Sequence, residues 1–219
     1  MSGPPLAELL LVSGITLEAP ALERLAWLAA ELLRWNRTHN LTAITDPDEV
    51  NEKHLADSLT LLPLLAGARR LLDLGSGAGF PALPLKIACP ELEVVSVDAV
   101  GKKIAFQRHV ARTLQLSGFT AVHTRAEDLA GSSFCQAGFD VITARALGGL
   151  PLLARLADPC LAPAGRLIAM KGAEAAAELA AAREALADLG FACTAQHRLR
   201  LPVSGAERTL LVLEKTGQG

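Results

Sequence analysis

The spacing of apolar residues predicts helices in the first third of the chain. Leucines and a tryptophan recur three or four positions apart in residues 21–38, with charged residues between them, which is the pattern of an amphipathic helix. Residues 49–65 repeat this pattern, and the Asp-Pro pair at 46–47 is a typical helix start. A shorter apolar run predicts a helix over residues 5–12. We therefore expect residues 1–66 to form a helical segment.

From residue 69 onwards, short apolar runs alternate with helical patterns. The apolar runs predict strands over residues 70–74, 92–97, 120–123, 141–144, 165–170, 191–199 and 208–214. The stretches between them predict helices over residues 82–88, 102–116, 150–156 and 173–189. Such alternation is typical of an α/β fold, with a seven-stranded, mostly parallel sheet wrapped by helices on both faces.

The last two predicted strands follow each other with no helix between them, so we expect them to pair antiparallel and the last strand to be antiparallel to the sheet. Residues 67–219 would then form a single compact core, with the helical segment 1–66 packed on it.

Composition fits an ordered globular protein, with 51% hydrophobic and 20% charged residues. No apolar run approaches the roughly 18 residues that span a bilayer. The first residues carry no basic group before their apolar run, so they do not resemble a secretory leader. The cysteines are Cys89, Cys135, Cys160 and Cys193, and their wide separation predicts reduced, buried cysteines of a cytoplasmic protein and no metal site.

A glycine-rich segment carries the strongest chemical signal. The apolar run 71–74 leads into Gly75, Gly77 and Gly79, and Asp73 stands two positions before the first glycine. Only a backbone without Cβ atoms passes this close to a ligand at a strand-to-helix turn, where free N–H groups also point outward. The next strand ends in Asp98, the position of a ribose-binding carboxylate in βαβ nucleotide sites.

The glycine spacing argues against a dinucleotide. A dinucleotide site has the pattern G-x-G-x-x-G, whereas this chain has G-x-G-x-G followed by Phe80. Together with Asp73 and Asp98, the pattern resembles the S-adenosylmethionine site of Rossmann-type methyltransferases. That cofactor has no phosphate, and Asp73 is placed to hold its ammonium directly or through water. A tight turn that binds nothing is the alternative.

Further motifs narrow the resemblance. They are the polar string Trp35–Ile44, His54 with Asp57-Ser58-Leu59, the loop Gly79–Leu85, Lys102-Lys103, Arg125-Ala126-Glu127, Arg145-Ala146, Lys171-Gly172 and Glu207-Arg208. In this order and spacing, residues 20–215 closely resemble the RsmG family, also called GidB. That family comprises bacterial methyltransferases that act on guanine N7 in small-subunit (16S) ribosomal RNA.

The resemblance implies a Rossmann-like class I methyltransferase fold, S-adenosylmethionine as cofactor, and a set of site residues. Those expected to bind the cofactor are Asp73, Gly75, Gly77, Gly79, Phe80, Asp98, Ala126, Glu127 and Arg145, the last of which would also position the substrate. Those expected to bind RNA are Asn36, Arg37, Asn40, His54, Lys102, Lys103, Arg125, Lys171, Arg198 and Arg208.

Several of these residues also have structural explanations. Asp98 would cap the following helix, Glu127 would be an exposed acid and Arg145 an ion-pair partner. The Lys102-Lys103 pair would be solvated surface. The polar residues Asn36, Asn40 and His54 would cap chain turns between helices.

Guanine N7 has an in-plane lone pair and no proton to lose, so its methylation needs alignment rather than a general base. A net charge of −2 does not suit a general RNA-binding protein, so we expect 16S rRNA to be recognised within the small ribosomal subunit. We also expect a monomer. Two alternatives remain open. One is an S-adenosylmethionine-dependent enzyme with a small-molecule or protein acceptor, and the other is a nucleotide-binding regulatory module without catalysis.

Overall fold

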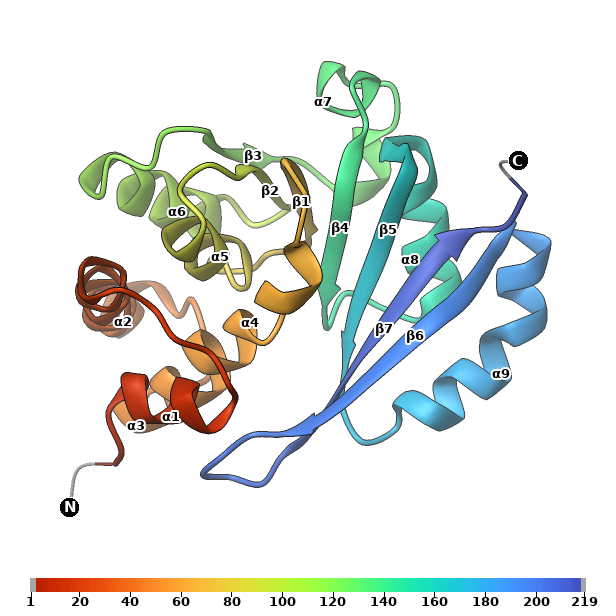
Figure 1. The fold of residues 1–219 in the computed structure, drawn as a ribbon. Coiled ribbons are helices and arrows are strands. Elements are labelled where there is room, and N and C mark those ends of the chain that lie inside the picture. Colours follow the sequence, from red (N-terminus) through yellow and green to blue (C-terminus); the bar gives the residue numbers. More distant parts are fainter. Residues whose placement is uncertain (1–2, 218–219) are drawn as a thin grey trace.

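A seven-stranded sheet organises the structure, a computed structural model that describes residues 3–217 (Figure 1). The strand order is β3-β2-β1-β4-β5-β7-β6. The strands are β1 (Arg70–Leu74), β2 (Glu93–Asp98), β3 (Phe119–His123), β4 (Phe139–Arg145), β5 (Leu161–Lys171), β6 (Phe191–Arg200) and β7 (Glu207–Lys215). Each of the seven predicted strands is present, with ends that differ by a few residues.

The strand directions also confirm the prediction. β1 to β5 pair in parallel, while β7 runs antiparallel to both β5 and β6. Since β7 inserts between β5 and β6, the last strand lies inside the sheet rather than at its edge. The carboxyl ends of β1, β2, β4 and β5 therefore meet at one edge, where ligands bind in open α/β sheets.

Helices cover both faces of the sheet. The α-helices are α1 (Leu6–Val12), α2 (Ala19–His39), α3 (Pro47–Val50), α4 (Asp57–Leu59), α5 (Ala82–Ala88), α6 (Gly101–Thr113), α7 (Ser133–Gln136), α8 (Leu150–Ala157) and α9 (Ala175–Asp188). Short 3₁₀ segments cover Leu62–Leu65, Ala126–Leu129 and Asp158–Cys160, and a π-helix covers Asn51–Ala56. The patterns did not predict the short elements Ala126–Leu129 and α7.

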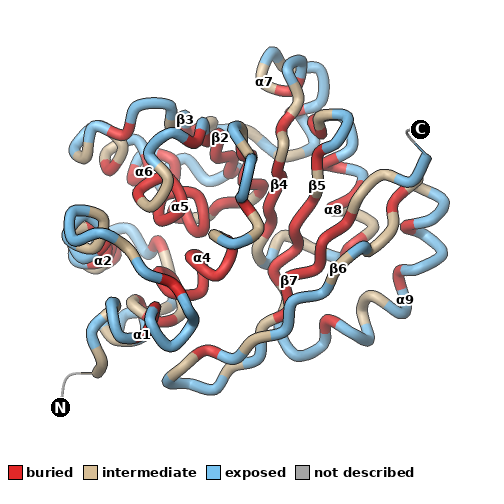
Figure 2. The backbone as a smooth tube through the Cα atoms, viewed as in Figure 1, coloured by how far each residue is buried: buried red, intermediate tan, exposed pale blue. Residues whose placement is uncertain are grey.

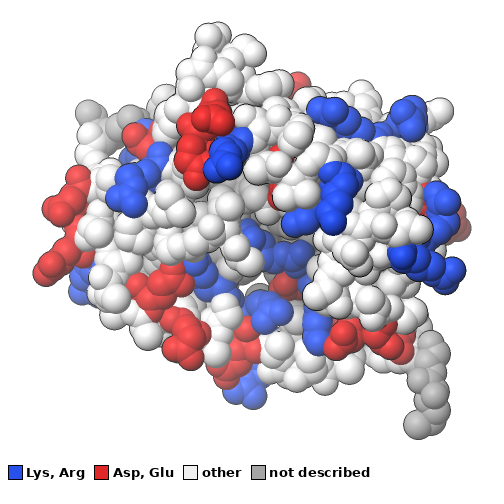
Figure 3. Space-filling view, turned by 180° about the vertical axis from the view of Figure 1, so that it is seen from behind, with Lys and Arg blue, Asp and Glu red and all other residues white. Residues whose placement is uncertain are grey.

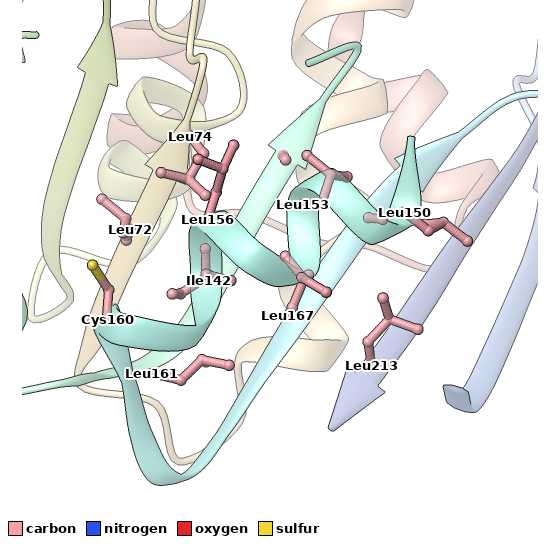
Figure 4. Close-up of a cluster of buried hydrophobic side chains, with 14 of the residues drawn as sticks. Leu72, Leu74, Ile142, Leu150, Leu153, Leu156, Cys160, Leu161, Leu167 and Leu213 are labelled. Atoms are coloured by element: carbon pink, nitrogen blue, oxygen red, sulfur yellow. The ribbon is translucent and has the colours of Figure 1, made fainter. Parts of the chain in front are cut away.

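Successive side chains of each strand point to opposite faces of the sheet, and this divides the core into two layers. On β1, Leu72 and Leu74 face α8 and α9, whereas Leu71 faces α5. Figure 4 shows leucines of α8, including Leu150 and Leu153, directed at the sheet on the face to which Leu72 and Leu74 belong. The central strands are consequently buried almost throughout, while exposed positions follow the outer helices and the β6–β7 hairpin (Figure 2).

The helix predicted over residues 49–65 is interrupted. It is divided into α3, the π-helix Asn51–Ala56, α4 and a 3₁₀ turn. One contact across the fold and one local contact accompany the change: the Lys53 carbonyl accepts from Arg145, and the Ser58 hydroxyl donates to the His54 carbonyl one turn earlier. Single π-turns inside helices are frequent at functional sites.

The cysteines depart from the prediction of four reduced, buried thiols. Cys135 and Cys160 form a disulfide, and the sequence hides it because the two residues lie 25 positions apart on α7 and the 3₁₀ turn before β5. Cys89 and Cys193 are free and only half-buried. Within residues 3–217, no helix is long and apolar enough to cross a membrane.

The β6–β7 hairpin reaches the N-terminal helices. The buried Glu52 carboxylate accepts hydrogen bonds from the amides of Val203 and Ser204, at 2.6 and 2.8 Å, at the hairpin tip. Figure 1 shows this tip extending beyond the sheet to the level of α1 and α3. A single carboxylate therefore joins segments about 150 residues apart in the chain.

We expect Glu52→Ala to lower the free energy of unfolding by about 2 kcal/mol, because a hydrogen-bonded buried carboxylate is lost. Glu49→Ala is the matched control: Glu49 forms an exposed ion pair with Lys53, which contributes at most about 1 kcal/mol. Urea titration of both variants measures the difference. Equal losses in the two variants would show that the hairpin contact does not stabilise the fold.

Candidate functional site

The glycine loop between β1 and α5 adopts a backbone that other residues resist. Gly75, Gly77 and Gly79 have φ values of 66°, 62° and 94°. A Cβ on Gly75 would lie 2.6 Å from the Leu147 side chain, and a Cβ on Gly79 would lie 2.5 Å from that of Leu83. The loop therefore needs glycine for both its conformation and its packing.

Asp98 holds this loop against β2. Its Oδ2 accepts from the Gly77 amide and its Oδ1 from the Val100 amide, both at 2.8 Å. The second contact shapes the turn before α6 (Gly101–Thr113) but does not cap the helix, because the N-cap residue of α6 is Val100 and no side chain caps it. Each carboxylate oxygen still has a lone pair available for a further donor, so the expected ribose contact stays a prediction.

Asp73 lies beneath the loop. It is completely buried, and its Oδ2 accepts from the Ala82 amide at 3.2 Å, while Oδ1 has no hydrogen-bond partner among the described residues. Burial raises the pKa of Asp73 to about 7, although the Ser76 hydroxyl and the Ala82 amide oppose the shift. This position supports the start of α5, and the predicted contact with the cofactor ammonium stays a prediction.

Two hollows meet at the sheet edge. The glycine-loop hollow, about 230 Å³, is lined by Leu41, Thr42, His54, Gly75, Ser76, Gly77, Ala78, Phe80, Lys103, Arg145 and Ala146. The basic hollow, about 400 Å³, is lined by Ile44, Lys53, His54, Asp57, Arg145, Ala146, Met170, Lys171, Gly172 and Arg208. His54, Arg145 and Ala146 form the wall that the two hollows share.

Arg145 is held in this wall by the N-terminal helices. Its Nη1 donates to the Lys53 carbonyl at 3.0 Å and to Asp57 Oδ2 at 3.2 Å, and its Nη2 contacts His54 Nδ1 at 3.2 Å. Asp57 also accepts from Arg208 Nε at 3.0 Å through its other oxygen. Arg145 thus forms the ion pair of the structural alternative and lines both hollows, so the two interpretations are compatible.

His54 is neutral in this arrangement. Burial and the neighbouring Arg145 lower its pKa to about 3. Its ring stacks on Phe80, with centroids 4.7 Å apart, and its Nε2 lies 2.9 Å from Thr42 Oγ1. The stack joins the N-terminal segment to the glycine loop.

Basic residues extend from this wall. A third hollow, about 410 Å³, shares Arg208 with the basic hollow and includes Arg198. Lys171 donates to the Gly148 carbonyl and pairs with Glu178 at 2.8 Å, so it also ties β5 to α9. Figure 3 shows Lys and Arg side chains around a central depression on one face of the molecule.

The other predicted residues lie in varied positions. Asn36 is buried, and its amide bonds the backbone of Leu41 and Thr42, as in the capping alternative. Asn40 caps α2 with a left-handed backbone. Lys103 lines the glycine-loop hollow. Five predicted residues line neither of the two central hollows. Ala126 is half-buried, and the other four, Arg37, Lys102, Arg125 and Glu127, are exposed.

Thr42 lines the glycine-loop hollow and Asp57 the basic hollow, and neither was predicted as a site residue. Thr42 belongs to the polar string, and Asp57 follows His54 by three positions. Helical spacing places Asp57 and His54 on one face, which is a signal that the sequence contains. Nothing in the sequence indicates that Asp57 would bind two arginines from β4 and β7.

The raised pKa of Asp73 predicts a pH effect on stability. Ionising the buried carboxyl is unfavourable only in the folded state, so its contribution to the free energy of unfolding falls as pH rises from about 4 to about 7. Relative to Asp73→Asn, which does not titrate, the wild-type protein should lose at most about 1.4 kcal/mol per pH unit in this range. Urea denaturation at successive pH values measures the difference, and a pH-independent difference would contradict the assignment.

Comparison with known proteins identifies the family. The model of the GidB family, described as rRNA small subunit methyltransferase G, matches residues 21–202. Two proteins named ribosomal RNA small subunit methyltransferase G are similar: that of Syntrophotalea carbinolica is 53% identical over 96% of both chains, and that of a Geobacter species is 48% identical over 91% of both.

Solved structures show the same fold. A SAM-dependent methyltransferase from Aquifex aeolicus superposes with a TM-score of 0.57 at 14% identity, over 77% of this chain and 93% of that one. The family model matches most of the chain, and the glycine loop and the strand order agree with it. The chain therefore belongs to the GidB family of S-adenosylmethionine-dependent rRNA small subunit methyltransferases.

Proposed function

We propose that the glycine-loop hollow holds the methyl donor, that the basic hollow receives the target guanine of 16S rRNA, and that transfer to N7 takes place at the shared wall. The observation that carries this assignment is the wall itself. His54, Arg145 and Ala146 line both hollows, so ligands in the two would be adjacent there. Ala146 has a left-handed backbone, with φ of 57°, which is uncommon for a residue other than glycine and frequent at functional sites.

The residues of the first hollow fit S-adenosylmethionine. Gly75 and Gly77 bring the loop backbone to the wall of the hollow, and Asp98 lies at the end of β2 where ribose hydroxyls bind in this fold. When bound, the cofactor supplies a methyl group on a positively charged sulfur. We assign Gly75, Phe80 and Asp98 to its binding, with the backbone of Ala126 and Glu127 near its adenine.

Arg145 would orient the base. A guanidinium only donates hydrogen bonds, and the edge of guanine that carries N7 presents the acceptor O6, whereas adenine presents an amino group there. Contacts with Lys53, His54 and Asp57 fix the Arg145 side chain in one orientation. Because guanine N7 has no proton, the wall needs no general base and works by alignment and exclusion of water.

Several features support an assembled particle as the substrate. The net charge is −2, and both Lys171 and Arg208 pair with carboxylates of the chain itself. The electrostatic field around the basic hollow is therefore short-ranged, and binding of the protein to bare RNA should be weak and salt-sensitive. We propose that the monomer acts in the cytoplasm on 16S rRNA within the small subunit. A small-molecule acceptor or a regulatory role without catalysis does not agree with membership of an rRNA methyltransferase family.

Substitution of Arg145 tests the shared wall. Arg145→Lys keeps the charge but loses the fixed fork of donors, so we expect methyl transfer to fall about 100-fold, as for a misaligned substrate. Calorimetry with S-adenosylhomocysteine should show a much smaller change. Arg155→Ala, at an exposed arginine of α8 outside the three hollows, is the control. Wild-type turnover by Arg145→Lys would overturn the alignment role.

The substrate itself is tested with labelled S-adenosylmethionine and three acceptors: protein-free 16S rRNA, small subunits and whole ribosomes. We expect small subunits to be methylated fastest and at one guanine. Chemical cleavage of the RNA at N7-methylated guanines locates that position. Lys171→Ala and Arg208→Ala should each impair transfer to RNA more than cofactor binding and reduce the log–log salt dependence by about one unit per lost phosphate contact. If protein-free RNA reacts as fast as small subunits, the requirement for a particle is wrong.

A further inference from the structure

Thr42 lies where the N-terminal segment meets the glycine loop. It follows α2 by three residues, is half-buried, and lines the glycine-loop hollow together with Gly75 and Gly77. It does not line the basic hollow. Thr42 therefore lies beside the space assigned to the methyl donor and not beside the space assigned to the base.

A chain of hydrogen bonds fixes where the Thr42 proton points. Arg145 only donates, so His54 Nδ1, at 3.2 Å from Nη2, must be the acceptor. The remaining ring proton is then on His54 Nε2, which donates to Thr42 Oγ1 at 2.9 Å. The Ile44 amide donates to the same oxygen at 3.2 Å.

Both lone pairs of the Thr42 hydroxyl are occupied by these two donors. Its own proton remains, and no described residue accepts a hydrogen bond from it. The hydroxyl is therefore an obligate donor beside the hollow, in contrast to an ordinary threonine, which rotates to donate or accept.

The charges of the hollow indicate which acceptor it meets. The charged side chains among the described lining residues are Lys103 and Arg145, and both are cationic. The two nearby acids are not in this lining: Asp73 is completely buried beneath the loop, and Asp98 bonds backbone amides. A hollow with two cations and an obligate donor suits a negatively charged acceptor.

We propose that the Thr42 hydroxyl, oriented by Arg145 through His54, donates to the carboxylate of the amino-acid end of S-adenosylmethionine. The inference rests on the proposed placement of the cofactor in this hollow. It assigns Thr42 to cofactor binding and gives His54 a role as a positioning residue for that donor.

Calorimetry with two probes tests the assignment. S-adenosylhomocysteine carries the carboxylate, whereas 5′-methylthioadenosine lacks the whole amino-acid end. Thr42→Val removes the hydroxyl at nearly constant shape and should weaken S-adenosylhomocysteine about tenfold, the usual effect of losing a hydrogen bond to a charged group. Affinity for 5′-methylthioadenosine should not change. Thr42→Ser should restore most of the lost affinity, and Thr45→Val, at an exposed threonine nearby, should have no effect on either probe.

A second measurement needs no variant. The wild-type protein should bind the methyl ester of S-adenosylhomocysteine at least about tenfold more weakly than the free acid, because the ester has no charged acceptor. The assignment is overturned if Thr42→Val weakens both probes equally, or if it leaves S-adenosylhomocysteine binding unchanged and lowers only kcat/KM for RNA, which would place the hydroxyl on the guanine. If the wild-type protein binds neither probe, the proposed cofactor hollow fails as well.

Discussion

One buried carboxylate connects the parts of this molecule. Asp57 accepts hydrogen bonds from Arg145 at the end of β4 and from Arg208 at the start of β7. Its side chain is only 2% exposed, so neither guanidinium shares it with bulk water. Removal of one partner from such a buried arrangement typically costs about 3–5 kcal/mol, because a charge remains without its counterion. Asp57 therefore links the N-terminal helices to β4 and to the β6–β7 hairpin, and the contacts of Glu52 with the hairpin tip and of His54 with Phe80 act beside it.

Further contacts join the N-terminal segment to the residues around the two hollows. The π-helix Asn51–Ala56 supplies Glu52 to the hairpin tip, the Lys53 carbonyl to Arg145, and the His54 ring to Phe80. Each contact reaches an element of the core. The helical segment thus supplies lining residues to both hollows and also covers the core, so neither hollow has its described shape without this segment.

Buried ionisable groups around the wall have shifted pKa values in opposite senses. Burial keeps His54 neutral by lowering its pKa and favours a proton on Asp73 by raising its pKa. Both effects lower the number of charges in a low-dielectric region. With His54 neutral and Arg145 charged, the directions of the hydrogen bonds around the hollow are fixed before any ligand arrives, which is the preorganisation that alignment chemistry needs.

Local patterns in the sequence determined the strands, the main helices and the antiparallel last strand. They also predicted the glycine loop and the position of Asp98 at the end of the second strand. Apolar periodicity and glycine spacing depend on neighbouring residues, so they can be recognised without the fold. The tertiary structure decided the rest. It broke the helix over residues 49–65, paired Cys135 with Cys160, and buried Asn36 of α2 with its amide bonded to the backbone of Leu41 and Thr42. It also brought Asp57 between two arginines located 88 and 151 residues further along the chain. Such contacts depend on where distant segments meet, and burial then sets their charge and hydrogen-bond direction, so no local pattern encodes them.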